Sequence, residues 1–308
     1  MRESVALEHT YHTVLCVVSL LRNSMQSARG FEYGVRHIIS PQSGRLIDVL
    51  LSTLSLDRTE IEFLLGLGSI YLNHKRVKED FSVSAGDYLR VHTKPRRFPV
   101  FDINWNDRVI FSDENFIVAN KISGIPVHAS VDNDQEHLQF YLSKALDCDL
   151  FVTHRLDVPT RGLVVFAKSL KFQSEFNKLL LQREMTKIYK ATVEGQGLQT
   201  GVLTHYMEPS PRAPKTVSHE PHEGWQDCVL EILDIKLLAE NRSELKIHLL
   251  TGRTHQIRAQ LGYEKHPIIG DHAYGAKKIS DIEKIELEAN ELSFVDPIKN
   301  QKHSFSLS

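Results

Sequence analysis

Residues 154–162 read H-R-L-D-V-P-T-R-G and run directly into the apolar segment L-V-V-F-A-K, residues 163–168. The change from polar to continuously apolar residues predicts a loop that leads into a buried strand. Loops held by a rigid sheet often carry catalytic groups, so Asp157 is a candidate catalytic carboxylate. On its own, an aspartate before a turn is more often a turn or capping residue. The segments on either side therefore decide between these interpretations.

Strand-like segments surround this stretch from about residue 100 to residue 308. Their sequences are V-I-F-S (109–112), F-I-V-A-N-K (116–121), Y-K-A-T-V-E-G (189–195), V-L-E-I-L-D-I (229–235) and L-K-I-H-L-L (245–250). Two helices are predicted among them, over residues 135–146 and 171–183. This pattern predicts an α+β fold with a large sheet, mostly antiparallel or mixed, over residues 100–308.

A separate small domain is predicted over residues 44–94. R-L-I-D-V-L-L (45–51) and D-R-T-E-I-E-F-L-L (57–65) predict two short helices, and the strand-like segments S-I-Y-L-N and D-Y-L-R-V-H follow. The proline-containing segment K-P-R-R-F-P (94–99) predicts a linker between the two domains. Residues 1–40 show no clear periodicity, so we expect a poorly structured extension or, alternatively, a transit peptide.

The stretch H-R-L-D-x-x-T-x-G-L-x-x-F-A-K resembles the signature of the RluA-type RNA pseudouridine synthase family. Further segments resemble that family in the expected order: residues 115–128, 187–195, 249–261, 266–275 and 287–297. Residues 44–94 resemble the S4 RNA-binding domain. The resemblance covers about residues 44–308 and implies a pseudouridine synthase fold behind an S4-like domain, acting on RNA without a cofactor.

The resemblance also implies roles for individual residues. Asp157 would be the catalytic carboxylate, which either attacks the sugar or removes a proton from it. Arg258 would keep this carboxylate ionised, and Tyr189 would stack on uracil and assist proton removal at C5. Arg155 would enter the place that a flipped nucleotide vacates, and Arg253 would bind RNA. The alternatives are a core role for Tyr189 and phosphate or carbonyl binding for the arginines.

The S4-like segment contains a basic turn that can contact structured RNA. Its candidate RNA-binding residues are His74, Lys75, Arg76 and Lys78. Cations in such a turn can meet backbone phosphates, although a solvated basic turn without a ligand explains the same charges.

Three positions depart from the family pattern. Arg161 stands where the family usually has a serine, Val158-Pro159 replaces a charged pair, and Ile122 replaces a proline. None of these changes removes a proposed catalytic group. Arg161 is close enough in sequence to Asp157 to influence the carboxylate or the choice of substrate.

The composition limits the remaining classes of function. The net charge of −2 argues against a uniformly basic nucleic-acid binder but leaves room for local basic patches. The three cysteines, Cys16, Cys148 and Cys228, have no C-x-x-C spacing, and H-E-P-H (219–222) lacks the spacing of a helical zinc motif. We therefore expect no metal. The apolar run at residues 14–21 is too short to span a bilayer.

The leading interpretation is an isomerase that converts specific uridines to pseudouridine in ribosomal RNA or, as a second choice, in transfer RNA. We expect a monomeric, cytoplasmic protein without membrane contact, or an organellar one if residues 1–40 are a transit peptide. The alternatives are a non-catalytic RNA-binding or assembly protein with the same fold and a hydrolytic nucleosidase that uses Asp157.

Overall fold

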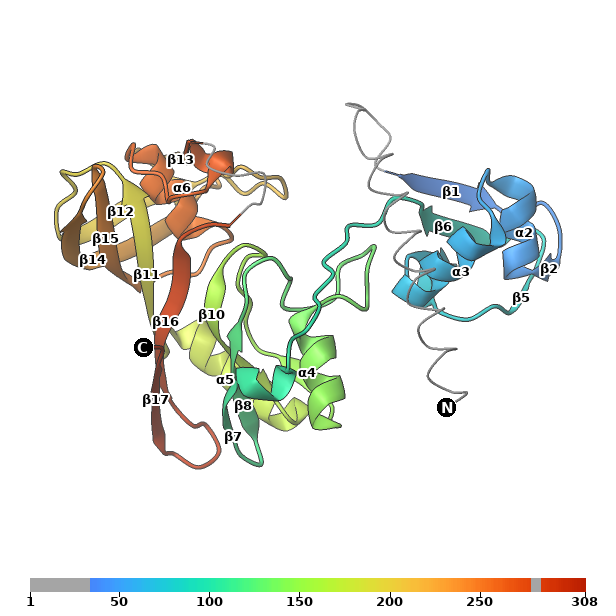
Figure 1. The fold of residues 1–308 in the computed structure, drawn as a ribbon, viewed down its shortest axis with the longest axis horizontal. Coiled ribbons are helices and arrows are strands. Elements are labelled where there is room, and N and C mark those ends of the chain that lie inside the picture. Colours follow the sequence, from blue (N-terminus) through green and yellow to red (C-terminus); the bar gives the residue numbers. More distant parts are fainter. Residues whose placement is uncertain (1–33, 278–283) are drawn as a thin grey trace. The chain divides into compact units, whose positions relative to one another are not determined.

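The computed structural model describes residues 34–277 and 284–308. The chain divides into two compact units, Met1–Leu65 with Ser69–Pro95, and Gly66–Gly68 with Arg96–Ser308. Figure 1 colours the described part of the first unit from blue to teal and the second from teal to red. None of the helices in the described part of the chain is long and apolar enough to cross a membrane.

The first unit combines two helices with a small antiparallel sheet. Its elements are β1 (Val35–Ile39), β2 (Gly44–Arg45), α2 (Leu46–Thr53), α3 (Arg58–Leu67), β3 (Ile70–Leu72), β4 (Lys75–Val77), β5 (Ser82–Val83) and β6 (Tyr88–His92). The main sheet has the order β1-β6-β3-β4. Asp57 and Glu60 cap the start of α3, since each carboxylate accepts a hydrogen bond from the other residue's backbone N–H.

The expected poorly structured extension over residues 1–40 is wrong for residues 35–39. These residues form β1, which pairs with β6 from Val35↔His92 to Ile39↔Tyr88. Most of this edge strand is exposed or half-buried, so it shows no apolar alternation, and its partner lies about 50 residues further along the chain. Residues 1–33, with the transit-peptide alternative, lie outside the described residues.

The second unit is built around one large sheet. Its strands are β7 (Val109–Ser112), β8 (Phe116–Lys121), β9 (Phe151–Val152), β10 (Arg161–Ala167), β11 (Thr186–Glu194), β12 (Gly201–Met207), β13 (Val217–Ser218), β14 (Gln226–Leu238), β15 (Arg242–Leu249), β16 (Leu287–Val295) and β17 (Lys302–Ser306). The order is β13-β12-β14-β15-β11-β16-β10-β8-β7, with β17 on β16 and β9 on β10. Among these strands only β10 and β16 pair in parallel, so the predicted mostly antiparallel sheet is confirmed.

The helices of this unit are α4 (Leu138–Leu146), α5 (Leu170–Gln182) and α6 (Gln256–Tyr263), with 3₁₀ turns η1 (Trp105–Arg108) and η2 (His272–Tyr274). Figure 1 shows α4 and α5 near β8 and β10, whereas α6 lies near β13. The first two match predicted helices, but α6 was missed. Six of its eight residues are buried, so its sequence lacks the alternation of apolar and polar faces that identifies a surface helix.

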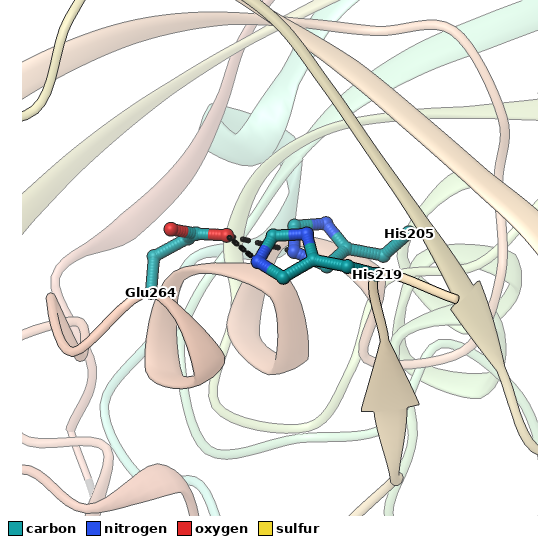
Figure 2. Close-up of side chains that lie close together, drawn as sticks. All are labelled: His205, His219 and Glu264. Carbon is teal, nitrogen blue, oxygen red and sulfur yellow. Dashed lines mark hydrogen bonds and ion pairs between the residues drawn. The ribbon is translucent and has the colours of Figure 1, made fainter.

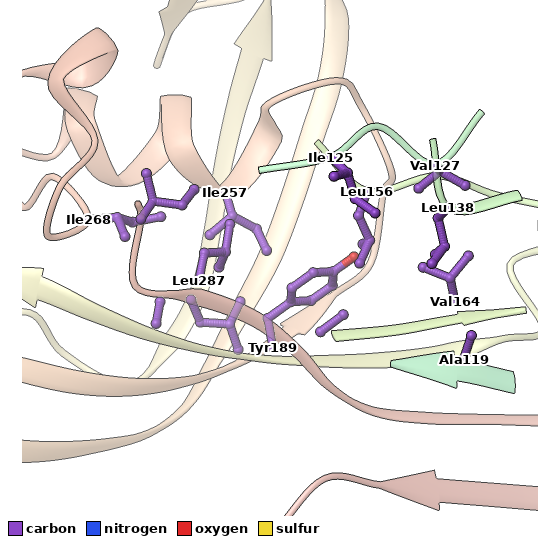
Figure 3. Packing of buried hydrophobic residues seen from close by; sticks show 14 of the residues in the cluster. Ala119, Ile125, Val127, Leu138, Leu156, Val164, Tyr189, Ile257, Ile268 and Leu287 are labelled. Atoms are coloured by element: carbon purple, nitrogen blue, oxygen red, sulfur yellow. The ribbon is translucent and has the colours of Figure 1, made fainter. Parts of the chain in front are cut away.

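The central residues of β8 and β10, 116–119 and 163–167, are continuously apolar because both faces of the sheet are covered. Val164 and Phe166 belong to one core cluster, whereas Leu163 and Val165 belong to another. Figure 3 shows the first cluster, in which Tyr189 lies between Leu287 and Leu156. At Gly162 a Cβ atom would collide with the backbone of Ala289, so the close approach of β10 and β16 requires glycine there. The Asp157 loop is thus attached to a rigid strand.

Candidate active site

One cavity of about 500 Å³ in the second unit collects five of the predicted site residues. These are Asp157, Tyr189, Arg258, Arg155 and Arg253. They come from the loop between β9 and β10, from β11, from the loop after β15 and from α6. The cavity is large enough for a small organic group such as a nucleoside.

Asp157 and Asp271 share the guanidinium of Arg258. Arg258 donates from Nε and Nη2 to Asp271 at 2.6 and 2.9 Å, which leaves Nη1 to donate to Asp157 Oδ2 at 3.3 Å. Burial lowers the pKa of Arg258, but the hydrogen bonds and charges of Asp271 and Asp157 outweigh it, and the pKa lies above its ordinary value. Asp271 therefore fixes the guanidinium, and the fixed guanidinium holds one oxygen of Asp157.

Lys121 holds the chain that follows Asp157. Its buried Nζ donates to the carbonyl oxygens of Ile122, Val158 and Thr160, at 3.0, 2.9 and 2.6 Å. Burial lowers the pKa of Lys121 to about 7, although the charge of Asp157 opposes this shift. Lys121 ends the predicted strand F-I-V-A-N-K (116–121), and the sequence pattern predicts no role for it. Its function here is to fix the main chain of the loop.

Tyr189 is at once a core residue and part of the cavity wall. Its side chain belongs to the apolar cluster, and Figure 3 shows its hydroxyl pointing toward Leu156, the residue before Asp157. Burial, and then the negative charge of Asp157, raises the pKa of the Tyr189 hydroxyl. The group is therefore a neutral phenol at ordinary pH, able to donate a hydrogen bond but poorly suited to act as a phenolate base.

Arg161 is paired with two glutamates and is not among the residues that line the cavity. It binds Glu288 at 2.5 Å and Glu286 at 3.4 Å, on and beside β16. Val158 contributes to the loop's fixation through its backbone carbonyl, which any side chain at that position would leave available. The departures from the family pattern at Arg161 and Val158 are therefore compatible with the observed geometry around Asp157.

The cations on the cavity wall differ in how free they are. Arg155 is exposed and donates to Thr254 Oγ1 at 3.2 Å, whereas Arg253 is paired with Asp227 at 2.9 Å. Lys187, which sequence reasoning missed, also lines the cavity, and burial lowers its pKa to about 8. It lies two residues before Tyr189, and strand alternation therefore puts both on one face. Arg155 and Lys187 are the cations most available to a ligand.

The remaining predicted RNA-binding residues lie in the first unit. His74 lies in the turn between β3 and β4, and its ring contacts Tyr88. Arg76 donates to the hydroxyl of Tyr71 at 2.7 Å. Lys75 and Lys78 are exposed. The basic turn is thus partly engaged within its own unit.

A group of three potential metal ligands lies near the far end of α6 from Arg258. His205, His219 and Glu264 lie together in Figure 2, with the ring nitrogen Nε2 of each histidine directed at Glu264 Oε1, at 2.8 and 3.4 Å. His219 belongs to the H-E-P-H segment, but its neighbours here are His205 and Glu264.

Hydrogen bonding argues against a metal at this group. Gln256 Nε2 donates to Gln260 Oε1, so the NH₂ of Gln260 faces His205 Nδ1 at 3.0 Å, beside the carbonyls of Leu203 and Cys228. Because an amide nitrogen cannot accept a hydrogen bond, this arrangement favours an unprotonated Nδ1, and Nε2 carries the hydrogen that Glu264 accepts. A histidine that binds a metal through Nε2 needs an acceptor, not a donor, for Nδ1–H. The three residues therefore fit a partly buried hydrogen-bond network and not a divalent cation.

His255 also lines the cavity and was given no role from the sequence. Its Nε2 lies 3.8 Å from Asp157 Oδ2, and its Nδ1 lies 2.9 Å from the hydroxyl of Tyr274. Residues 249–261, one of the segments that resemble the family, contain it, but only the fold brings it beside Asp157.

Comparison with known proteins identifies the family. The family model described as RNA pseudouridylate synthase matches residues 115–263. The tRNA pseudouridine synthase C of Vibrio parahaemolyticus is 30% identical over 216 residues, 63% of this chain and 87% of that protein. The chloroplastic RNA pseudouridine synthase 6 of Oryza sativa subsp. japonica is 38% identical over 215 residues, 62% of this chain and 45% of the relative.

The chain spans about half the length of its chloroplastic relatives. Among solved structures, Human RNA Pseudouridylate Synthase Domain Containing 4 superposes with a TM-score of 0.53 at 20% identity, over 66% of this chain and 89% of the other, which shows a shared fold. The family predicted from the H-R-L-D stretch is therefore confirmed, and the chain belongs to the RNA pseudouridylate synthases.

Proposed function

We propose that this protein isomerises specific uridines in folded RNA to pseudouridine, with Asp157 as the catalytic carboxylate. The observation that carries this proposal is the shared guanidinium of Arg258, which is fixed by Asp271 and holds Oδ2 of Asp157 at the cavity. The other oxygen, Oδ1, has no hydrogen-bond partner within residues 34–277 and 284–308 and is available to a substrate.

The chemistry needs one ionised carboxylate and a site that retains the released base. The C1′–N1 bond of uridine breaks, uracil turns, and C5 bonds to C1′ while the hydrogen on C5 leaves as a proton. Whether Asp157 attacks C1′ or removes a sugar proton, the first step uses a free carboxylate oxygen near an electron-poor sugar. Tyr189, as a neutral phenol on the cavity wall, supplies a ring face and a hydrogen-bond donor to the base.

An RNA substrate is supported by the cations around the cavity. Arg155 and Lys187 can meet phosphates beside the flipped nucleotide. We propose further that the first unit acts as an S4-like RNA-binding domain, because it presents two exposed lysines, Lys75 at the start of β4 and Lys78 directly after β4. A separate domain of this kind favours a large structured substrate, so ribosomal RNA is our first choice and transfer RNA our second.

The test is to incubate the purified protein with total RNA from cells that lack it and to map new pseudouridines by carbodiimide-dependent primer-extension stops. Stops are expected with the wild type and with Asp107→Asn, a control that removes an exposed carboxylate of η1, but not with Asp157→Asn. RNA binding without any new stop would instead favour a non-catalytic RNA-binding protein. Free uracil as the product would favour a nucleosidase.

A further inference from the structure

His255 has an unusual backbone conformation at the edge of the cavity. It precedes α6 with φ 60° and ψ 18°, in the left-handed region that residues other than glycine rarely adopt. Although it occupies the N-cap position, its side chain makes no capping hydrogen bond. The ring is instead directed at Tyr274 and Asp157. A left-handed backbone in a residue that does not cap its helix often occurs at functional sites.

The hydroxyl of Tyr274 determines which nitrogen of His255 carries hydrogen. The backbone N–H of Lys215 donates to this hydroxyl at 2.8 Å. The hydroxyl's own hydrogen then needs an acceptor, and within the described residues the available one is Nδ1 of His255, at 2.9 Å. This arrangement favours an unprotonated His255 Nδ1, with the hydrogen on Nε2.

The protonated nitrogen faces the catalytic candidate. Nε2 of His255 lies 3.8 Å from Asp157 Oδ2, the same oxygen that Arg258 holds at 3.3 Å. Both donors therefore approach one oxygen, and the opposite oxygen is left toward the cavity. A shortening of about 0.6–0.9 Å on substrate binding would complete the hydrogen bond, and catalytic hydrogen bonds commonly tighten when a site closes around its ligand.

We propose that His255 is a positioning residue for the reaction proposed above: a neutral imidazole, held in one tautomer by Tyr274, whose Nε2–H fixes Oδ2 of Asp157 so that Oδ1 faces the sugar. The inference rests on the proposed function. A neutral donor suits this place, because a second full cation beside Arg258 would repel the positive charge that develops at C1′.

The charges around the ring are consistent with a neutral state. The charged groups that act on it are Asp157, Arg258, Asp271 and Lys215. Burial lowers the pKa of His255, and the two carboxylates only partly offset this effect. The imidazole therefore stays neutral at physiological pH.

The tautomer can be measured on the free protein, without RNA. The protein is labelled with ¹⁵N in the histidine rings, and the His255 signals are assigned by their loss in His255→Gln. Long-range ¹H–¹⁵N spectra should show an unprotonated Nδ1 and a protonated Nε2 in the wild type, and a mixture of tautomers in Tyr274→Phe. A protonated Nδ1 in the wild type would overturn the inference.

The role in catalysis is tested by single-turnover release of tritium from RNA labelled at C5 of uridine, with an RNA that spans a site modified by the wild type. Glutamine can place an N–H where Nε2 was, whereas asparagine cannot reach so far but tolerates the left-handed conformation better. A positioning role predicts that His255→Gln is faster than His255→Asn, with His255→Asn roughly 10- to 100-fold slower than wild type. A purely structural role predicts the reverse order and sinks the proposal.

Tyr274→Phe should slow the same step while leaving the dissociation constant for RNA within about twofold, since Tyr274 acts through His255. Tyr263→Phe, a half-exposed tyrosine of α6, is the matched control and should react at the wild-type rate. Equal rates for Tyr274→Phe and Tyr263→Phe would contradict the proposal. A wild type that releases no tritium from any RNA would overturn the proposed function, whereas the NMR measurement decides the tautomer separately.

Discussion

A histidine and a carboxylate meet at each end of α6. The two pairs differ in whether the hydrogen bond between histidine and carboxylate is formed. At the end of the helix, His205 is fully buried and Nε2–H donates to Glu264 at 2.8 Å. At the start, His255 Nε2 stands 3.8 Å from Asp157 in the wall of a cavity. In both pairs a neighbouring group, the Gln260 amide or the Tyr274 hydroxyl, favours Nδ1 as the acceptor.

This difference indicates that the His255–Asp157 pair, and not the His205–Glu264 pair, is available for chemistry. A short hydrogen bond inside the protein has nothing left to offer a ligand and contributes to stability. A longer contact beside a cavity leaves a carboxylate oxygen for a substrate. Changes at the start of α6 should therefore alter activity, and changes at its end should alter stability.

The largest effect is expected for Asp157→Asn. The substitution keeps the shape of the side chain but removes the charge and the free carboxylate oxygen. Turnover, measured as tritium release in a single turnover, should fall by at least about 10³-fold. The free energy of unfolding, measured in urea, should change by less than about 1 kcal/mol, because the side chain is only partly buried. A large loss of stability would instead mean that Asp157, like the His205–Glu264 pair, contributes mainly to stability.

Asp271→Asn should affect both properties, because Asp271 is the partner that compensates the buried charge of Arg258. Breaking a buried ion pair by removing one charge costs about 3–5 kcal/mol. We expect urea unfolding to show a loss of this size, together with lower activity. A variant as stable as the wild type would show that Asp157 alone compensates Arg258.

Glu264→Gln should have a small effect confined to stability. The amide oxygen of glutamine can still accept the hydrogen bond from His205, so the expected cost is about 1 kcal/mol in urea unfolding. Tritium release should stay at the wild-type rate. A drop in activity comparable to that of Asp271→Asn would mean that the two ends of α6 are coupled.

The pH dependence of stability should contain a contribution from His205. Burial lowers the pKa of His205 in the folded protein, although Glu264 opposes the shift. The unfolded chain therefore takes up more protons below about pH 6.5, and the folded state loses stability as the pH falls through this range. Unfolding of wild type and His205→Gln in urea at pH 7.5 and 5.5 should show a smaller pH dependence in the variant. An unchanged difference would assign the effect to the other histidines whose pKa burial lowers, His154 and His255.

Much of the architecture was predictable from local patterns. Apolar runs identified β8 and β10, and the ordered motifs directed attention to Asp157, Tyr189 and Arg258, which the fold brings to one cavity. The helix α6 was missed because burial on both sides removes the usual amphipathic pattern.

The role of His255 could not be predicted because it depends on Lys215 and Tyr274, which lie 40 and 19 residues away along the chain. Lys187 was overlooked for a simpler reason, since a lysine in a strand is ordinarily a solvated residue. Only its place in the cavity wall identifies Lys187 as a candidate ligand-binding residue.

The way in which Lys121 fixes the Asp157 loop has a consequence for mutational tolerance. Its Nζ donates to the carbonyl oxygens of Val158 and Thr160 in the loop and of its own neighbour Ile122, and within residues 34–277 and 284–308 it has no hydrogen bond to a loop side chain. The main chain that carries Asp157 is therefore held through backbone atoms that every amino acid possesses. The side chains of Val158 and Arg161 can then be exchanged with little effect on the carboxylate, which leaves this loop free to diverge in sequence while its chemistry is preserved.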